Sequence, residues 1–313
     1  MSKPILYIAE LADFSKDVIS RLKERFEILN PASTTDIKRI LEQVDVFWFR
    51  LAHQINGEVL THHSRCKYLV TPVTGIDHID EKLCRELGVN ILSLRGEYEF
   101  LNKVRATAEL TLALTLSLLR HITDAVEHTR NKLWQRDQFR GRELFEKKVG
   151  IVGYGRLGNI CGNYFHAMGC KVAYFDTETK EHETWAHKCD SLEALLSYSD
   201  VVTIHVPFNE STRGMFNSSS IAQMKDASIL INTSRGGIIE EEALLYALQS
   251  GKLSGAALDV LEGEPNIKES RLIAYSLENR NLIITPHIGG NTYESFEKTE
   301  HFMAEKLIQS AFR

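Results

Sequence analysis

The sequence predicts an α/β protein with two doubly wound domains, each built on a parallel β-sheet with helices on both faces. Three observations support this prediction. Short apolar segments alternate with segments of helical periodicity along most of the chain. A glycine-rich turn within residues 149–158 joins one apolar segment to one helical segment. The length of 313 residues is enough for two domains of ordinary size.

The first hundred residues alternate between predicted strands and helices. The first helix illustrates the pattern, because Val18, Ile19 and Leu22 recur at helical spacing. Strands are expected at residues 4–9, 26–29, 45–49, 68–71 and 89–92, and helices at residues 15–26, 35–43, 58–62 and 80–87. The alternation predicts a parallel sheet covered on both faces.

Residues 101–134 are expected to form a helix of a different kind. Residues 106–119 are apolar almost throughout, with Glu109 as an exception, and a helix that is apolar on all sides is buried on more than one side. We expect this helix to link the two domains and to form part of a homodimer interface. The apolar stretch is too short to span a membrane, which takes about 18 residues or more.

The composition favours some classes of protein and argues against others. Apolar residues make up 43% of the chain and charged residues 25%, and the formal net charge is −5. These values favour a folded protein without a nucleic-acid or membrane partner. The number of cysteines is five, and no C-x-x-C occurs, so neither structural zinc nor a disulfide framework is expected. Without a signal-peptide pattern at the N-terminus, we expect a cytoplasmic protein.

The glycine-rich turn has the spacing G-x-G-x-x-G. Gly153 permits the tight turn, Gly155 lets a pyrophosphate approach the backbone, and Gly158 lets the following helix pack close to the strand. The start of that helix offers free N–H groups and the positive end of its dipole to phosphates. Such a turn alone is a weak signal, because glycine loops are common.

A second strand at residues 171–175 strengthens the interpretation. It ends at Asp176, about 20 residues beyond the last glycine, where an acid is expected to bind the ribose hydroxyls of NAD. Taken alone, Asp176 could equally be a solvated turn residue. Together with the glycine turn it predicts a dinucleotide-binding Rossmann domain. The carboxylate also favours NAD over NADP, because it repels a 2′-phosphate.

The alternation resumes after the glycine turn and leads to the expected reaction site. Further strands are expected at residues 201–206, 228–232, 255–260 and 282–285, and helices at residues 192–198, 218–224, 240–249 and 291–312. Ligands of open parallel sheets bind beyond the carboxyl ends of the strands. Arg235, Glu264 and His287 follow three of these strands, and Asp259 lies at the end of one of them. We therefore expect these side chains at one edge of the sheet.

This set of side chains suits the interconversion of a 2-hydroxy acid and a 2-oxo acid. Arg235 can bind a carboxylate in a bidentate manner and polarise the carbonyl. His287 can exchange the proton of the hydroxyl group, and Glu264 can hydrogen-bond and orient it. Asp259 is placed to hold the nicotinamide end of the cofactor. Each residue taken singly also has an ordinary explanation as an ion-pair, loop or turn residue.

The sequence resembles the NAD-dependent D-2-hydroxyacid dehydrogenases, particularly the branch similar to phosphoglycerate dehydrogenase. The resemblance covers nearly the whole chain. Its motifs are Val152 to Gly158, His205-Val206-Pro207, Ile231 to Gly236, Gly255 to Val260 with Glu264-Pro265, and Thr285 to Gly290. It implies a flavodoxin-like substrate-binding domain of residues 1–100 plus 290–313 and an NAD-binding Rossmann domain of residues 101–289.

The resemblance also implies roles for individual residues. The catalytic residues would be Arg235, Glu264 and His287. The residues that contact NAD would be Gly153, Gly155, Arg156, Leu157, Gly158, Asp176, Val206, Pro207, Thr233, Ser234, Asp259 and Gly289. The substrate would be bound by Arg50, Arg235 and backbone amides near Thr74 and Gly75. A dimer is usual in the family.

Two features depart from the phosphoglycerate branch. Arg50-Leu51-Ala52-His53 stands where a polar Arg-Ser-x-Thr run is usual, and the linker at residues 94–103 is longer. Basic residues nevertheless gather on the expected substrate side and favour a substrate with a second acidic group. They are Arg50, His53, Arg95, Lys103 and Arg105. Several of them could instead pair with Glu97, Glu99 or Glu109.

Two other functions fit the same motifs. One is a non-catalytic NAD-sensing scaffold of the type of the C-terminal-binding corepressors, which retain the same three catalytic residues. Their interaction segments and extended tails are not evident in this sequence. The other is a formate dehydrogenase, but that branch pairs its histidine with glutamine, whereas Glu264 is an acid.

Overall fold

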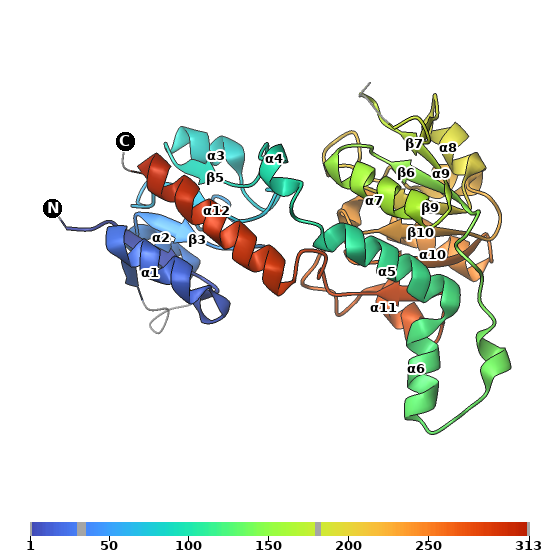
Figure 1. Cartoon of the computed structure of the whole chain (residues 1–313). Helices are drawn as coiled ribbons and strands as arrows, with labels where there is room; N and C mark the ends of the chain where they lie inside the picture. The colour runs from blue at the N-terminus through green and yellow to red at the C-terminus, as the bar shows by residue number, and fades with distance from the viewer. Residues whose placement is uncertain (1, 30–35, 179–182, 312–313) are drawn as a thin grey trace. The chain divides into compact units, whose positions relative to one another are not determined.

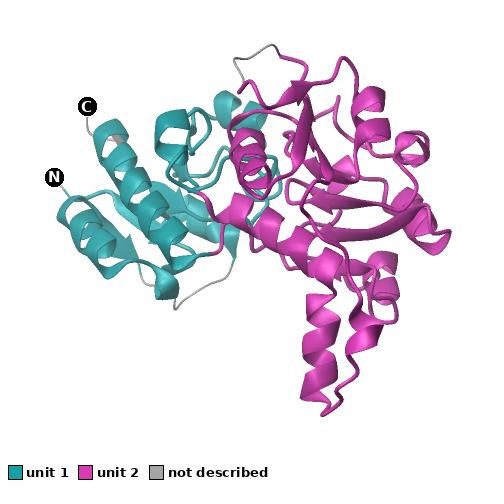
Figure 2. Ribbon diagram, turned by 45° about the vertical axis from the view of Figure 1, so that its right-hand side comes forward, with its two compact units in different colours: residues 1–104, 292–313 teal, residues 105–291 magenta. Residues whose placement is uncertain are grey.

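The chain forms two compact units in a computed structural model, which describes residues 2–29, 36–178 and 183–311. Unit 1 comprises Met1–Val104 and Thr292–Arg313, and unit 2 comprises Arg105–Asn291 (Figure 2). Each unit has its own parallel sheet, so the predicted fold class is confirmed. The predicted ends of two helices at Thr35 and Phe312 lie outside the described residues.

Unit 1 has a sheet of five parallel strands in the order β2-β1-β3-β4-β5, the order of flavodoxin-like folds. The strands are β1 (Ile5–Ile8), β2 (Glu27–Leu29), β3 (Val46–Trp48), β4 (Tyr68–Val70) and β5 (Asn90–Leu92). The helices are α1 (Lys16–Arg25), α2 (Ile37–Gln43), α3 (Glu81–Glu86), α4 (Tyr98–Leu101) and α12 (Tyr293–Ala311). Figure 1 shows α12, the last helix of the chain, beside α1.

The core of unit 1 lies on both faces of its sheet. Along β1, Leu6 and Ile8 belong to one cluster of buried side chains and Tyr7 to the other, as the two-residue period of a strand requires. The first cluster also contains Met303 and Leu307 of α12. Helix α12 is therefore an integral part of the core of unit 1.

Unit 2 has a sheet of seven parallel strands in the order β12-β11-β10-β9-β6-β7-β8. The strands are β6 (Lys148–Val152), β7 (Lys171–Phe175), β8 (His187–Lys188), β9 (Val201–Ile204), β10 (Ser228–Asn232), β11 (Leu253–Leu258) and β12 (Leu282–Ile284). The helices are α5 (Ala106–Arg120), α6 (Ile122–Arg130), α7 (Arg156–Ala167), α8 (Leu192–Tyr198), α9 (Ser218–Gln223), α10 (Glu241–Gln249) and α11 (Arg271–Ser276). The order reverses between β6 and β9, as in a Rossmann fold.

The prediction of one helix over residues 101–134 is wrong. The segment contains the end of α4, then α5 and α6, with non-helical residues between α4 and α5. His121 separates α5 from α6, because its backbone is left-handed with φ 52° and ψ 40°. Such a residue ends a helix, and histidine adopts this conformation more readily than most side chains.

The short helix predicted at residues 58–62 is also absent. A single turn forms there instead, with the Leu60 N–H donating to the Asn56 carbonyl at 2.9 Å. A segment this short gains too few hydrogen bonds to offset the cost of nucleating a helix. Conversely, the structure contains two elements that the sequence pattern did not predict, β8 and α11.

Two further features are the state of the cysteines and the apolar length of the helices. Cys66, Cys84, Cys161, Cys170 and Cys189 are all buried and unpaired. Within the described ranges, no helix is both long and apolar enough to cross a membrane.

Candidate active site

The glycine-rich turn connects β6 to α7 in unit 2. Gly153 has φ +88°, a conformation that glycine adopts at little cost. A Cβ on Gly158 would lie 2.0 Å from the carbonyl oxygen of Gly153, so only glycine lets the first turn of α7 pack against the loop. A Cβ on Gly155 would meet nothing within 4 Å. The loop is therefore tight on its inner side and open at Gly155.

The open side of the loop fits the phosphates of a dinucleotide. Gly155 is the N-cap of α7 and has no side chain with which to cap the helix. The backbone N–H groups of the first turn of α7, which includes Arg156 and Leu157, are thus suited to an anionic ligand. Burial lowers the pKa of Arg156, and the nearby charge of Arg105 lowers it further.

Asp176 lies directly after β7, beside the same loop. One carboxylate oxygen accepts a hydrogen bond from the Tyr154 backbone N–H at 2.7 Å, and the other accepts one from the Glu178 N–H at 2.8 Å. Each carboxylate oxygen can accept a further hydrogen bond. The Asp176 side chain is therefore oriented by the backbone and retains acceptor capacity for ribose hydroxyls.

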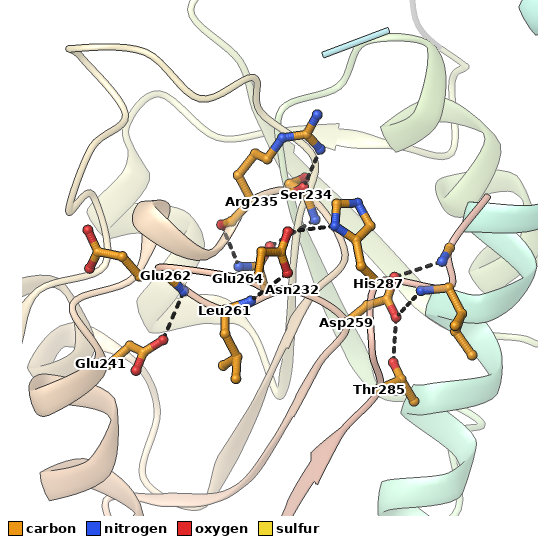
Figure 3. A network of polar contacts seen from close by, with 12 residues as sticks. Asn232, Ser234, Arg235, Glu241, Asp259, Leu261, Glu262, Glu264, Thr285 and His287 are labelled. Atoms are coloured by element: carbon orange, nitrogen blue, oxygen red, sulfur yellow. Dashed lines mark hydrogen bonds and ion pairs between the residues drawn. The ribbon is translucent and has the colours of Figure 1, made fainter. Parts of the chain in front are cut away.

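Glu264 and His287 form the most direct contact of the candidate catalytic set. The Nδ1 atom of His287 lies 2.5 Å from Oε1 of Glu264 (Figure 3). The other oxygen of Glu264 accepts a hydrogen bond from the Leu261 N–H at 3.3 Å. The predicted pairing of these two side chains is thus present, and it leaves Nε2 as the ring nitrogen that can exchange a proton with a ligand.

Asp259 is hydrogen-bonded to the loop that carries His287. Its side chain accepts hydrogen bonds from the Thr285 hydroxyl at 2.5 Å, the Ile288 N–H at 2.9 Å and the Gly289 N–H at 2.7 Å. Its backbone carbonyl accepts one from the His287 N–H at 2.8 Å. The residue is 1% exposed, and burial raises the pKa of its carboxyl group. The structure therefore uses Asp259 to hold the loop that carries His287.

The backbone of His287 makes this support necessary. Its φ of +53° lies in the left-handed region, which costs a non-glycine residue free energy. The hydrogen bonds to Asp259 on either side of His287 hold it there. Strained residues of this kind occur often at functional sites.

Arg235 lies in the loop that follows β10. The Asn232 side chain spans this loop, because its Nδ2 donates to the Arg235 carbonyl at 2.9 Å and its Oδ1 accepts from the Ser234 N–H at 3.0 Å. A Cβ on Gly236 would lie 2.0 Å from the backbone of Leu261, so the loop rests directly on the segment after β11. Arg235, Glu264 and His287 thus follow the neighbouring strands β10, β11 and β12.

The other residues predicted to contact NAD surround these loops. Thr233 is buried, and its hydroxyl lies 2.9 Å from that of Thr111 on α5. The Ser234 hydroxyl donates to the Ile204 carbonyl at 2.8 Å. Val206 and Pro207 follow β9, and a Cβ on Gly153 would lie 2.8 Å from Val206. These contacts place the segment after β9 beside the glycine-rich turn.

Three residues of the site were not predicted from the sequence. Asn232 and Thr285 hold the loops that carry Arg235 and His287, and Thr111 contacts Thr233 from a distant segment. A polar residue at the end of a predicted buried strand was the available signal for Asn232 and Thr285. No local pattern indicates Thr111. Among the described residues, no three His, Cys, Asp or Glu side chains are grouped so that they could hold a metal ion.

The residues predicted to bind substrate in unit 1 lie after two neighbouring strands. Arg50 follows β3, and Thr74 and Gly75 follow β4. Thr74 is exposed, and Gly75 is half-buried. Arg50 is paired within unit 1, since its Nη2 lies 2.5 Å from Oε1 of Glu300 on α12. Arg95, a second basic candidate, lies 3.0 Å from Glu81 rather than from Glu97 or Glu99.

Comparison with known proteins places the chain in a family. The model of the D-isomer specific 2-hydroxyacid dehydrogenase NAD-binding domain matches residues 112–289. A hydroxypyruvate reductase of Thermotoga maritima is 33% identical over 288 residues, which is 92% of each chain. A D-3-phosphoglycerate dehydrogenase of Synechocystis is 31% identical over 93% of this chain but only 51% of its own length.

Solved structures agree with the sequence relatives. D-Lactate dehydrogenase of Aquifex aeolicus, in complex with NAD and lactic acid, superimposes with a TM-score of 0.80 at 26% identity, covering 98% of this chain and 96% of that one. This chain therefore belongs to the D-isomer specific 2-hydroxyacid dehydrogenase family. It is an NAD-dependent oxidoreductase, and the resemblance seen in the motifs is confirmed.

Proposed function

We propose that the protein interconverts a D-2-hydroxy acid and the corresponding 2-oxo acid at a site formed around Arg235, Glu264 and His287. Bound NAD(H) supplies or accepts the hydride at C2. The contact of 2.5 Å between His287 Nδ1 and Glu264 Oε1 carries the proposal, because it orients the imidazole and leaves Nε2 to exchange a proton with the substrate. Turnover of 2-oxo acids with NADH tests it.

In this proposal each catalytic side chain has a defined role. The guanidinium of Arg235 binds the substrate carboxylate and polarises the carbonyl oxygen at C2. The Nε2 atom of His287 donates a proton to that oxygen during reduction and accepts it during oxidation. Glu264 orients the imidazole through its contact with Nδ1, and Asp259 keeps the His287 backbone in place.

Unit 1 would supply the remaining contacts with the substrate. We infer that residues 1–100 with 290–313 act as the substrate-binding domain, and residues 101–289 as the NAD-binding domain. Backbone amides near Thr74 and Gly75 would bind the carboxylate of the substrate, which suits an exposed turn at the end of a strand. Of the five basic residues that favoured a second acidic group in the substrate, Arg50 lies just after β3.

Asp176→Ala is expected to raise the Kd for NADH by about 10-fold or more, because a charge-assisted hydrogen bond to a ribose hydroxyl is lost. The same change should reduce the discrimination against NADPH. Fluorescence titration with both cofactors measures the effect. Asp190→Ala is a matched control, since Asp190 is an exposed acid of the same unit. An unchanged Kd for NADH in Asp176→Ala would contradict the assigned role.

We also propose that the protein is a homodimer that pairs through α6 and the segment after it. Figure 1 shows α6 and this segment extending away from the sheet of unit 2. Five large apolar side chains between positions 122 and 145 are 41–89% exposed. They are Ile122, Val126, Leu133, Trp134 and Phe145. An apolar surface of this kind typically marks an interface with another chain.

Sedimentation equilibrium is expected to give twice the chain mass of 35.6 kDa. Trp134→Ser combined with Val126→Lys should shift the protein toward monomer, because it removes apolar area and adds a charge to the interface. Leu277→Ser is the control, since Leu277 is 81% exposed but lies outside this segment. A wild-type monomer at micromolar concentration would contradict the proposal.

We infer a cytoplasmic location from the cysteines. All of them are buried as free thiols, and none is joined in a disulfide, which is typical of proteins from a reducing compartment.

A further inference from the structure

Arg50 occupies the position in unit 1 where a ligand is expected. The strand order of the unit 1 sheet reverses between β1 and β3, and open parallel sheets bind ligands at the carboxyl ends beside such a reversal. Glu10 and Arg50 lie just after these two strands, and the Arg50 N–H donates to Oε1 of Glu10 at 3.3 Å. A guanidinium at this place would suit an acidic group of a substrate.

The guanidinium of Arg50 is nevertheless turned to α12. Its Nη2 lies 2.5 Å from Oε1 of Glu300, and its central carbon lies 3.4 Å from the centroid of the Phe296 ring. Phe296 and Glu300 are four residues apart, so they share one face of the helix. The guanidinium is thus held by the Glu300 carboxylate at one nitrogen and by the Phe296 ring beside its central carbon.

Glu300 is well suited to hold this arginine. Its side chain is 1% exposed, against 16% for Arg50. Its second oxygen accepts a hydrogen bond from the Ser15 N–H at 2.9 Å, which fixes the carboxylate before α1. Burial raises the pKa of Glu300, whereas Ser15 and Arg50 lower it. Because a buried carboxylate needs a partner, releasing Arg50 would leave Glu300 uncompensated.

The local charge is also unfavourable for a second anion. Burial lowers the pKa of Arg50, whereas the negative charges of Glu300, Glu10 and Asp13 raise it. Three carboxylates therefore act on one guanidinium at this end of the sheet. An additional acidic group brought here would be repelled by these carboxylates.

We propose that Glu300 is a specificity-determining residue. By holding Arg50 against α12, it withholds the guanidinium from the substrate, so that the enzyme prefers 2-oxo acids whose only acidic group is the 2-oxo carboxylate. This inference rests on the proposed function and replaces the expectation of a second acidic group, which rested on Arg50 together with His53, Arg95, Lys103 and Arg105. Phe296 assists by covering the guanidinium plane.

The test compares two classes of 2-oxo acid in the full-length enzyme with NADH. Glyoxylate and hydroxypyruvate represent the first class, and oxaloacetate and 2-oxoglutarate the second. The wild-type enzyme should favour the first class in kcat/KM. Glu300→Gln keeps the shape of the side chain but removes its charge, and it should raise the ratio of second-class to first-class kcat/KM by about 10-fold or more.

Three further variants assign the effect to Arg50. Adding Arg50→Met to Glu300→Gln should abolish the gain, since no guanidinium remains to be released. Glu305→Gln is the matched control, because Glu305 lies on the same helix and pairs with Arg21 instead; its ratio should equal that of the wild type. Phe296→Leu should shift the ratio in the same direction as Glu300→Gln by a smaller factor, and it avoids a buried substitution.

The outcomes are distinguishable. A wild-type enzyme that prefers the diacids, and loses this preference in Arg50→Met, would overturn the inference while leaving the proposed function intact. An unchanged ratio in both Glu300→Gln and Phe296→Leu, with melting temperatures near that of the wild type, would overturn it as well. Absence of turnover with every acid would overturn the proposed function, and this inference with it.

Discussion

Replacing His287 with glutamine is expected to lower kcat by about 10³-fold, the typical contribution of a positioned general acid or base. Glutamine can still accept or donate a hydrogen bond, but it cannot exchange a proton near neutral pH. The Kd for NADH should stay within about 3-fold of the wild-type value, because no cofactor contact is assigned to the ring. Stopped-flow reduction of a 2-oxo acid and fluorescence titration with NADH measure the two quantities.

A second histidine and a second acid serve as comparisons for His287→Gln. His166→Gln changes an exposed histidine of α7 and should leave kcat unaltered. Glu264→Gln removes the charge beside Nδ1 and should lower kcat less than His287→Gln does, because the imidazole itself remains. If His287→Gln weakened NADH binding as much as it slowed turnover, the role in proton transfer would be wrong.

Arg235→Lys is expected to lower kcat/KM for the 2-oxo acid by about 10²-fold or more. Lysine keeps the positive charge but loses the planar fork that binds a carboxylate through two parallel hydrogen bonds, each worth about 1.5–3 kcal/mol when charged. Both the KM and kcat should change, since the guanidinium binds the carboxylate and polarises the carbonyl. Steady-state kinetics over a wide range of substrate concentration separates the two effects.

The matched control is Arg271→Lys, because Arg271 is an exposed arginine of the same unit that pairs with Glu242. It should leave kcat/KM within experimental error. An Arg235→Lys enzyme that retained more than about a third of the wild-type kcat/KM would show that bidentate binding is not needed.

The part of the site that could be predicted follows from local rules. The spacing of Gly153, Gly155 and Gly158 predicts a strand, a tight turn and a closely packed helix, and the structure shows these features. The pairing of Glu264 with His287 could be predicted because the ends of neighbouring parallel strands meet at one edge. Both predictions need only the order of strands along the chain.

The part that could not be predicted depends on contacts between distant segments or on single residues. Arg50 and Glu300 are 250 positions apart, and no periodicity in either segment indicates that they meet. The hydrogen bonds from the Ile288 and Gly289 N–H groups to Asp259 likewise join segments about 30 positions apart, and no local pattern indicates them. The separation of α5 from α6 depends on one left-handed residue, His121, which the apolar pattern does not reveal.

The central claim is that the site around His287 reduces 2-oxo acids. The most direct measurement is the oxidation of NADH by the purified protein with glyoxylate, hydroxypyruvate and pyruvate, followed by chiral analysis of the product. The account predicts turnover with at least one of these acids and, with hydroxypyruvate or pyruvate, the D-isomer of the hydroxy acid. NADH binding without turnover of any acid would contradict it and would favour a non-catalytic NAD-sensing scaffold.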